Sequence, residues 1–205
     1  MLPRTTRPAR TATPFMDTIT EILPCIGVVL AGGLSSRMGR DKALLPWQGR
    51  PLIERQLATL KQADVTETRV AGDRPDYGGI ADAWPHAGPL GGLDGIARAI
   101  AGNIDLLVIP VDMPLLQPPL LRRLRCEHPG ARSLSFVDHV LPLRLRLDNA
   151  SRAMLQNLMQ QDDPRQRSLR ALQVALNHQA LPLDASERAQ LADCNTATQW
   201  NEVTG

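Results

Sequence analysis

Apolar and polar residues alternate in blocks along this chain, and the spacing within the blocks switches between strand-like and helical. Residues 26–30 form a nearly continuous apolar run, typical of a strand buried on both faces. Pro51 suits the first turn of a helix, and Ile53, Leu57 and Leu60 then recur at helical spacing. A short strand is predicted over residues 68–71 and a helix over residues 90–100. Residues 105–111 contain Leu-Leu-Val-Ile and give the clearest strand of the chain.

The second half of the chain continues the alternation. A helix is predicted over residues 118–126, followed by strands over 132–137 and 143–147. The last strand alternates leucines with Arg144 and Arg146, which predicts a half-exposed strand. Helices are predicted over residues 150–160, 168–176 and 196–203. Strands that alternate with helices predict an α/β fold with a mostly parallel sheet, in one domain over residues 24–205.

The composition is that of an ordinary globular protein, with 43% hydrophobic and 21% charged residues. Aromatic residues are only 3%, so few side chains could stack on nucleic-acid bases. No apolar run approaches the length of a membrane span. Cys25, Cys126 and Cys194 are far apart and form no metal-binding pattern, which favours reduced thiols in a cytoplasmic protein.

The net charge of +2 comes from the beginning of the chain. Residues 1–16 carry Arg4, Arg7 and Arg10 and no acid, which leaves 20 basic residues against 21 acidic ones elsewhere. A nearly neutral folded part does not predict a nucleic-acid-binding surface. Because the beginning also lacks the apolar segment of a signal peptide, we interpret residues 1–20 as a disordered arm rich in Arg, Thr and Pro.

A glycine-rich segment follows the first predicted strand. Residues 30–42 read Leu-Ala-Gly-Gly-Leu-Ser-Ser-Arg-Met-Gly-Arg-Asp-Lys. Glycines let backbone N–H groups approach a ligand, while Arg37 and Lys42 carry charges suited to phosphate oxygens. The spacing is neither that of a P-loop nor G-x-G-x-x-G. The segment predicts a phosphate-binding loop, with a glycine-rich turn bearing solvated charges as the alternative.

Further candidate groups follow other predicted elements. Asp112 comes directly after the strand at 105–111 and would meet the glycine loop at the carboxyl edge of the sheet, where its carboxylate suits Mg²⁺. Taken alone, Asp112 is better explained as a turn residue before a proline, and only its place beside the glycine loop favours the metal ligand. The segment Gly88-Pro-Leu-Gly-Gly92 would bring a substrate to a helix N-terminus. Asp82 would contact a base or ribose, or is a surface acid.

These segments, in this order, resemble the molybdenum cofactor guanylyltransferase family of the nucleotidyltransferases. That family has L-A-G-G-x-S-x-R-M-G-x-D-K, then G-P-L-x-G, then D-x-P at a strand end, and N-T-P near the C terminus. This chain has Asp112-Met-Pro and Asp193-Cys-Asn195-Thr196 at the last two places. The resemblance runs from about residue 26 to 203 and implies a Rossmann-like, three-layer domain with helices on both faces of the sheet.

The resemblance implies that GMP passes from GTP to molybdenum-bound molybdopterin, with release of pyrophosphate. Arg37, Lys42 and Asp112 would be catalytic, with Asp112 the Mg²⁺ ligand. The implied GTP-binding residues are Leu30, Ala31, Gly32, Gly33, Lys42, Asp82 and Asp112. The implied pterin-side residues are Gly88, Pro89, Leu90, Gly92 and Asn195.

Implied partners are molybdoenzyme apoproteins or their chaperones, with neither nucleic acid nor membrane. The reaction needs no covalent nucleophile, and we interpret all four histidines as surface residues: His86, His128, His139 and His178.

The chain departs from the family pattern at a few positions. Ala71 or Gly72 stands where the family often has an asparagine, and Asn195-Thr196-Ala197 replaces Asn-Thr-Pro. Asp193 and Leu141-Pro142 also differ from the usual residues. Most departures fall on the pterin side, so a cytidylyltransferase, a sugar-phosphate nucleotidyltransferase and a non-catalytic nucleotide-binding protein remain alternatives. A nucleic-acid-binding factor acting through the basic arm is a further one.

Overall fold

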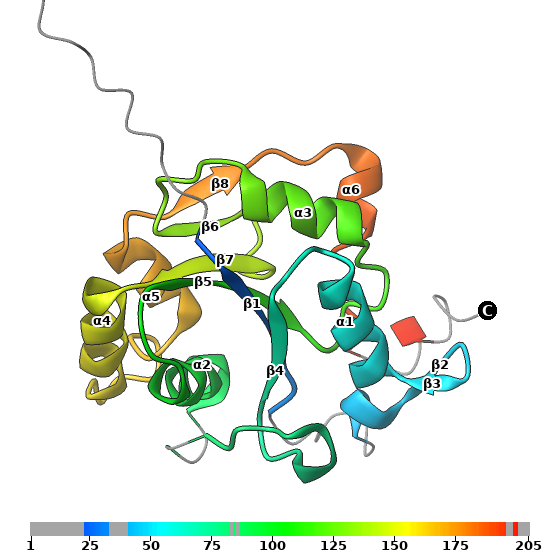
Figure 1. The fold of residues 1–205 in the computed structure, drawn as a ribbon, viewed down its shortest axis with the longest axis horizontal. Helices are drawn as coiled ribbons and strands as arrows, with labels where there is room; N and C mark the ends of the chain where they lie inside the picture. Colours follow the sequence, from blue (N-terminus) through cyan, green and yellow to red (C-terminus); the bar gives the residue numbers. More distant parts are fainter. Residues whose placement is uncertain (1–22, 33–40, 83, 85–86, 196–198, 201–205) are drawn as a thin grey trace, which may run out of the picture.

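The two most apolar runs form neighbouring parallel strands, β1 (Cys25–Leu30) and β5 (Ile104–Pro110). A computed structural model describes residues 23–32, 41–82, 84, 87–195 and 199–200. Among these residues the strands form a six-stranded sheet in the order β4-β1-β5-β7-β6-β8 (Figure 1). The other strands are β4 (Glu67–Ala71), β6 (Ser133–Phe136), β7 (Leu143–Leu147) and β8 (Gln179–Leu181). Only β7 is antiparallel to its neighbours, so the mostly parallel sheet is confirmed.

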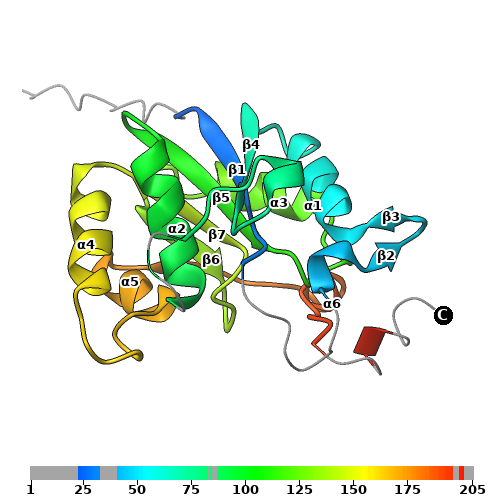
Figure 2. The same cartoon turned by 90° about the horizontal axis from the view of Figure 1, so that it is seen from below.

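Helices cover both faces of the sheet and give the predicted three layers (Figures 1 and 2). One face carries α1 (Leu52–Lys61) and α3 (Pro118–Cys126), with α6 (Ala185–Ala189) beside α3. The opposite face carries α2 (Gly88–Ala99), α4 (Asn149–Met159) and α5 (Leu169–Ala175). Short elements complete the described fold: η1 (Lys42–Leu44), β2 (Pro46–Trp47), β3 (Arg50–Pro51) and η2 (Pro75–Tyr77).

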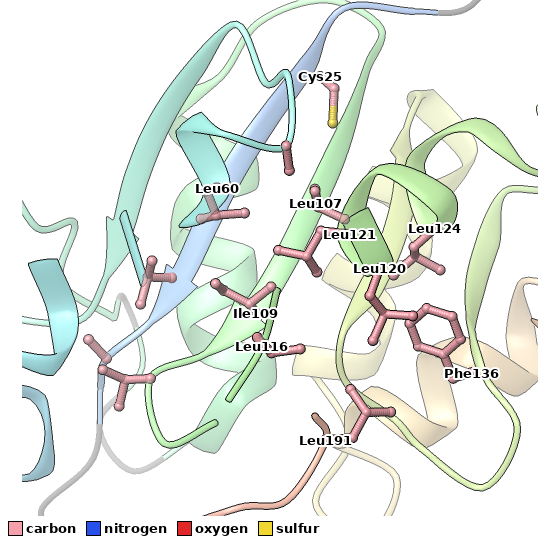
Figure 3. Packing of buried hydrophobic residues seen from close by; sticks show 14 of the residues in the cluster. Cys25, Leu60, Leu107, Ile109, Leu116, Leu120, Leu121, Leu124, Phe136 and Leu191 are labelled. Atoms are coloured by element: carbon pink, nitrogen blue, oxygen red, sulfur yellow. The ribbon is translucent and has the colours of Figure 1, made fainter. Parts of the chain in front are cut away.

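Apolar side chains fill the space between the layers. Figure 3 shows Leu60 of α1 and Leu121 of α3 close to Leu107 and Ile109 of β5, and all four are fully buried. A second cluster on the other face joins α2, α4 and α5 to the sheet. Burying one such leucine contributes about 1.5–3 kcal/mol, so the two clusters fix the strands and thereby the positions of the residues that follow them.

The prediction of a half-exposed strand at residues 143–147 was wrong. β7 lies inside the sheet with α3 against one face and α4 against the other, and Arg144 is only 1% exposed. Its guanidinium donates hydrogen bonds to the carbonyls of Arg125, Glu127 and His128, at 2.8, 2.7 and 2.6 Å. A buried charge is tolerated when it is hydrogen-bonded, as the two terminal nitrogens of Arg144 are, although its Nε has no partner among the described residues. Burial nevertheless lowers the pKa of Arg144 below its ordinary value.

Other differences from the predictions are local. The helix predicted over residues 90–100 begins two residues earlier, at Gly88, so the whole segment 88–92 forms the first turns of α2. The hairpin of β2 and β3, the edge strand β8 and the short α6 were not predicted. His178 is half-buried rather than a surface residue. The predicted arm and most of the helix predicted over residues 196–203 lie outside the described residues. None of the described helices has the length and apolar character needed to cross a membrane.

Candidate active site

Three parallel strands end side by side at one edge of the sheet. Leu30, the last residue of β1, pairs with Ala71 of β4 on one side and with Pro110 of β5 on the other. Beyond the strand, Ala31 N donates to Ala71 O at 2.9 Å, and Val111 N donates to Leu30 O at 3.2 Å. The segments that follow β1, β4 and β5 therefore begin side by side at the carboxyl ends of these strands, where α/β sheets bind their ligands.

Lys42, Asp112 and Asn195 meet at this edge. The Lys42 Nζ lies 3.4 Å from Oδ2 of Asp112 and donates a 2.5 Å hydrogen bond to Oδ1 of Asn195. These residues are 70 and 153 positions from Lys42 in the sequence, so the fold alone brings them together. The side chains of Lys42 and Asp112 are 15% and 24% exposed. The ammonium therefore stands beside oxygen atoms while remaining open to a ligand.

The C-terminal segment is tied directly to Asp112. Cys194 N donates to Asp112 O at 2.9 Å, which places the next residue, Asn195, at the site. The amide of Asn195 donates from Nδ2 to Asp193, so its oxygen is turned towards Lys42. Asn195, expected on the pterin side, lies beside the lysine expected to bind the triphosphate. Burial and the nearby charge of Asp112 raise the pKa of the Cys194 thiol.

Asp82 occupies a second part of the same edge. Its Oδ1 is buried and has no hydrogen-bond partner among the described residues, and burial raises the pKa of its carboxyl. A Cβ added at Gly92, in the first turns of α2, would lie only 3.2 Å from this oxygen and 3.2 Å from Cβ of Ala71. A Cβ at Gly32 would lie 3.7 Å from it. Glycine at positions 32 and 92 therefore lets the end of β1 and the start of α2 lie close to the unpaired Oδ1 of Asp82. This buried acceptor suits a ligand that carries N–H or O–H groups.

Arg74 is a functional candidate that the sequence analysis missed. It follows the carboxyl end of β4 and donates from Nε and Nη2 to Ala31 O, both at 3.1 Å. The same guanidinium forms a bidentate pair with Asp41, with Nη2 2.8 Å from Oδ1. The available signal was its place after a strand of the parallel sheet, a criterion that the sequence analysis applied to β1 and β5 only.

The other predicted site residues are exposed, buried in the core or outside the described residues. Gly33 and Arg37 lie outside the described residues. Gly88 and Pro89 are exposed at the start of α2, whereas the side chain of Leu90 is fully buried in the core. Leu90 could therefore contact a ligand only through its backbone. The structure thus brings Lys42, Asp112 and Asn195 into contact and places Asp82 between Gly32 and Gly92 at the same sheet edge.

Comparison with known proteins identifies the family and the fold. A family model described as a MobA-like NTP transferase domain matches residues 27–180. The chain belongs to this family. The resemblance seen in the sequence is therefore confirmed, and the protein is a nucleotidyltransferase of the MobA-like type.

Individual relatives agree with this assignment. The NTP transferase is 49% identical over 180 residues to a molybdenum cofactor guanylyltransferase of Xanthomonas euvesicatoria pv. vesicatoria (strain 85-10), covering 88% of this chain and 94% of that protein. It is 34% identical over 195 residues to a protein of the same name from Pseudomonas syringae pv. syringae (strain B728a), covering 88% and 94%. Its fold is similar to that of the molybdopterin-guanine dinucleotide biosynthesis protein A of Archaeoglobus fulgidus, with a TM-score of 0.69, 19% identity and coverage of 87% and 96%.

Proposed function

We propose that this nucleotidyltransferase transfers GMP from GTP to molybdenum-bound molybdopterin, which yields the guanine dinucleotide form of the cofactor and pyrophosphate. The observation that carries the proposal is the contact of Lys42 with Asp112 and Asn195 at the carboxyl edge of the sheet. The names of the Xanthomonas and Pseudomonas relatives support guanine as the base and the pterin as the acceptor.

Lys42 is proposed to bind the triphosphate. A compact ammonium contacts several phosphate oxygens at once, and the lysine lies at the carboxyl ends of β1, β4 and β5. Its present partners, Asp112 and Asn195, hold it in place through two side-chain oxygens. Arg37 is proposed to assist it, as the family resemblance implies. Leu30, Ala31, Gly32 and Gly33 would contribute backbone groups to the nucleoside.

The donor set at this edge fits Mg²⁺. Asp112 presents a partly exposed carboxylate, and the amide oxygen of Asn195 lies close by. Among the described residues no three His, Cys, Asp or Glu side chains gather as a closed metal cage. Mg²⁺ typically takes one or two protein oxygens and completes its coordination with substrate phosphates and water. Asp112 is therefore the proposed ligand, and bound Mg²⁺ would neutralise charge on the triphosphate.

Asp82 is proposed to recognise the nucleoside. Its unpartnered Oδ1 is an acceptor, and both the guanine edge and the ribose hydroxyls offer donors. A bound nucleoside would satisfy this buried oxygen, whose lack of a partner otherwise costs about 1–3 kcal/mol. Gly92 would let the nucleoside approach because a side chain there would meet the same oxygen.

The chain's own residues then act by positioning and charge. In the proposed reaction a pterin phosphate oxygen attacks the α-phosphorus of GTP and forms a new P–O bond. The bond between the α-phosphorus and the bridging oxygen breaks, and pyrophosphate leaves. The attacking oxygen is already ionised near neutral pH, so no general base is required. Lys42 stabilises the leaving phosphates, while Asp82 fixes the nucleoside.

The direct test is pyrophosphate release from purified protein supplied with molybdenum-loaded molybdopterin and either GTP or CTP. We expect release with GTP that depends on the acceptor, and a marked loss in Asp82→Asn. Release with CTP instead would identify a cytidylyltransferase. GTP binding without release in the presence of the pterin would identify a non-catalytic nucleotide-binding protein and overturn the proposal.

A further inference from the structure

Arg74 joins two segments that flank the glycine loop in the sequence. Its planar guanidinium donates twice to the carbonyl of Ala31, which directly follows β1, and pairs with both oxygens of the Asp41 carboxylate. The side chain of Arg74 is 18% exposed and that of Asp41 is 32% exposed, so the pair is partly shielded from water. Arginine is suited to such a contact because its donors form a rigid fork, which a lysine cannot reproduce.

Asp41 in turn fixes the start of η1. Its Oδ1 accepts a hydrogen bond from Ala43 N at 3.0 Å, and its carbonyl accepts one from Leu44 N at 3.1 Å. Lys42 is the first residue of η1 and lies between these contacts. One carboxylate is therefore shared between Arg74 and the backbone turn that carries the lysine.

The backbone of Arg74 is itself anchored to the sheet. Its carbonyl accepts hydrogen bonds from Gly79 N at 2.8 Å and Tyr77 N at 3.0 Å. Ile80 then pairs with Ala71, the last residue of β4, and accepts a 2.8 Å hydrogen bond from Gly72 N. The guanidinium is thus presented from a closed turn whose two ends are both attached to β4.

We propose that Arg74 is a positioning residue that fixes Asp41, and through it η1, so that the Lys42 ammonium lies beside Asp112 and Asn195. Its importance for catalysis rests on the proposed function, since Lys42 is there the triphosphate-binding group. Its effect on the position of Lys42 does not, because that effect is measurable without any nucleotide.

The chain contains only two lysines, Lys42 and Lys61, which makes this position directly observable. Reductive methylation with ¹³C-formaldehyde would give one NMR signal for each lysine besides that of the α-amino group. Lys61 is exposed in the last turn of α1 and serves as the internal reference. The experiment compares the full-length wild-type chain with Arg74→Gln, Arg74→Lys and a control, Arg69→Gln. Arg69 lies on β4 and pairs with Glu67 at the surface.

In Arg74→Gln we expect the Lys42 signal to move towards that of Lys61, while the Lys61 signal stays in place. The KM for GTP should rise on the order of tenfold with a smaller change in kcat, because the loss acts through one charge-assisted contact. Arg74→Lys adds a third lysine signal, which is assigned by comparison with the double variant Lys42→Arg/Arg74→Lys. Its Lys42 signal should show an intermediate shift, since the variant keeps the charge but not the fork. Arg69→Gln should leave the Lys42 signal and KM unchanged.

The outcomes separate the two proposals. If the Lys42 signal is the same in Arg74→Gln and wild type, the positioning role is wrong, even where nucleotide binding is intact. If the signal moves as expected but the wild-type chain binds no nucleotide, the positioning role stands and the proposed function fails. Should Arg74→Gln not fold, as judged by circular dichroism, Arg74→Lys decides: an unchanged Lys42 signal there would contradict the proposal.

Discussion

Lys42 and Arg144 are both cations withdrawn from water, but their surroundings differ. Arg144 on β7 is 1% exposed, and the partners of its terminal nitrogens are backbone carbonyls. The side chain of Lys42 on η1 is 15% exposed and contacts the side-chain oxygens of Asp112 and Asn195.

The nature of the partners separates a structural cation from a functional one. Backbone carbonyls at the end of α3 and in the segment after it cannot turn away from Arg144 as side chains can, so its terminal nitrogens stay occupied and serve the fold. Carboxylate and amide oxygens can turn towards a metal ion or substrate, and a partly exposed ammonium can then bind phosphate. The comparison predicts that changes at Arg144 reduce stability, whereas changes around Lys42 reduce activity.

The largest expected effect is at Asp112. Asp112→Asn keeps the shape of the side chain but removes its charge, so kcat/KM for pyrophosphate release should fall about 10³-fold. The melting temperature should change little because the carboxylate is partly exposed. Exposed Asp162 provides the matched control, and Asp162→Asn should keep full activity. Undiminished turnover in Asp112→Asn would remove Asp112 from the active site.

Arg144→Leu should reduce stability and leave nucleotide binding in place. Loss of the donors to four backbone carbonyls should lower the free energy of unfolding by about 3 kcal/mol. For a chain of this size that corresponds to a melting temperature lower by roughly 6–12 °C. GTP binding should persist at a temperature where the variant is folded. Arg188→Leu, at an exposed site on α6, should shift stability by no more than about 0.5 kcal/mol. An unaltered melting curve for Arg144→Leu would refute the structural role.

Lys42→Ala tests the functional cation of the pair. Loss of one charge-assisted contact of about 1.5–3 kcal/mol should weaken GTP binding roughly 10- to 100-fold, as measured by titration calorimetry. Lys61→Ala removes the other lysine, at an exposed position, and should bind GTP like the wild type. Equal GTP affinity in both variants would mean that Lys42 is a solvated charge rather than a phosphate ligand.

The smallest expected effect concerns His178, which directly precedes β8 and contacts β6. Its ring nitrogens contact Ser133 Oγ and Ser135 Oγ, both at 2.9 Å, and burial together with Arg170 lowers its pKa. The unfolded chain therefore binds the proton more readily. The stability contribution of neutral His178 is complete above its ordinary pKa of about 6.5 and is lost as pH falls through the lower folded value.

The melting temperature should accordingly fall more steeply between pH 7 and pH 5 in the wild type than in His178→Gln. The comparison is made by differential scanning calorimetry at matched ionic strength. Parallel pH profiles for the two proteins would show that His178 does not contribute to the pH dependence of stability.

Much of the fold could be predicted because its main elements are locally specified. The apolar runs of β1 and β5 and the spacing of Leu57 and Leu60 in α1 carry their structure in adjacent residues. The burial of Arg144 could not be predicted, since the same alternation occurs in strands with one open face and in strands covered on both faces. Only the packing of α3 on one face of β7 and α4 on the other decides between them.

Part of the candidate site could likewise be predicted from the sequence, and part could not. Lys42 and Asp112 could be predicted because each follows an apolar strand, and parallel strands end at one edge. The contact of Asn195 with Lys42 spans 153 residues and depends on the path of the C-terminal segment. Arg74 was missed because it belongs to no recognisable motif, and its contacts with Ala31 and Asp41 span 43 and 33 residues.

The most direct test of the central claim is a thermal-shift titration of the full-length protein with GTP, CTP, ATP and UTP, each with Mg²⁺. At a hundredfold excess over the dissociation constant, specific binding adds about 2.7 kcal/mol of stability. We predict that GTP alone raises the melting temperature, by several degrees. A shift with CTP or UTP instead, or no shift with any nucleotide, would contradict the assignment of a guanine nucleotide to this edge of the sheet.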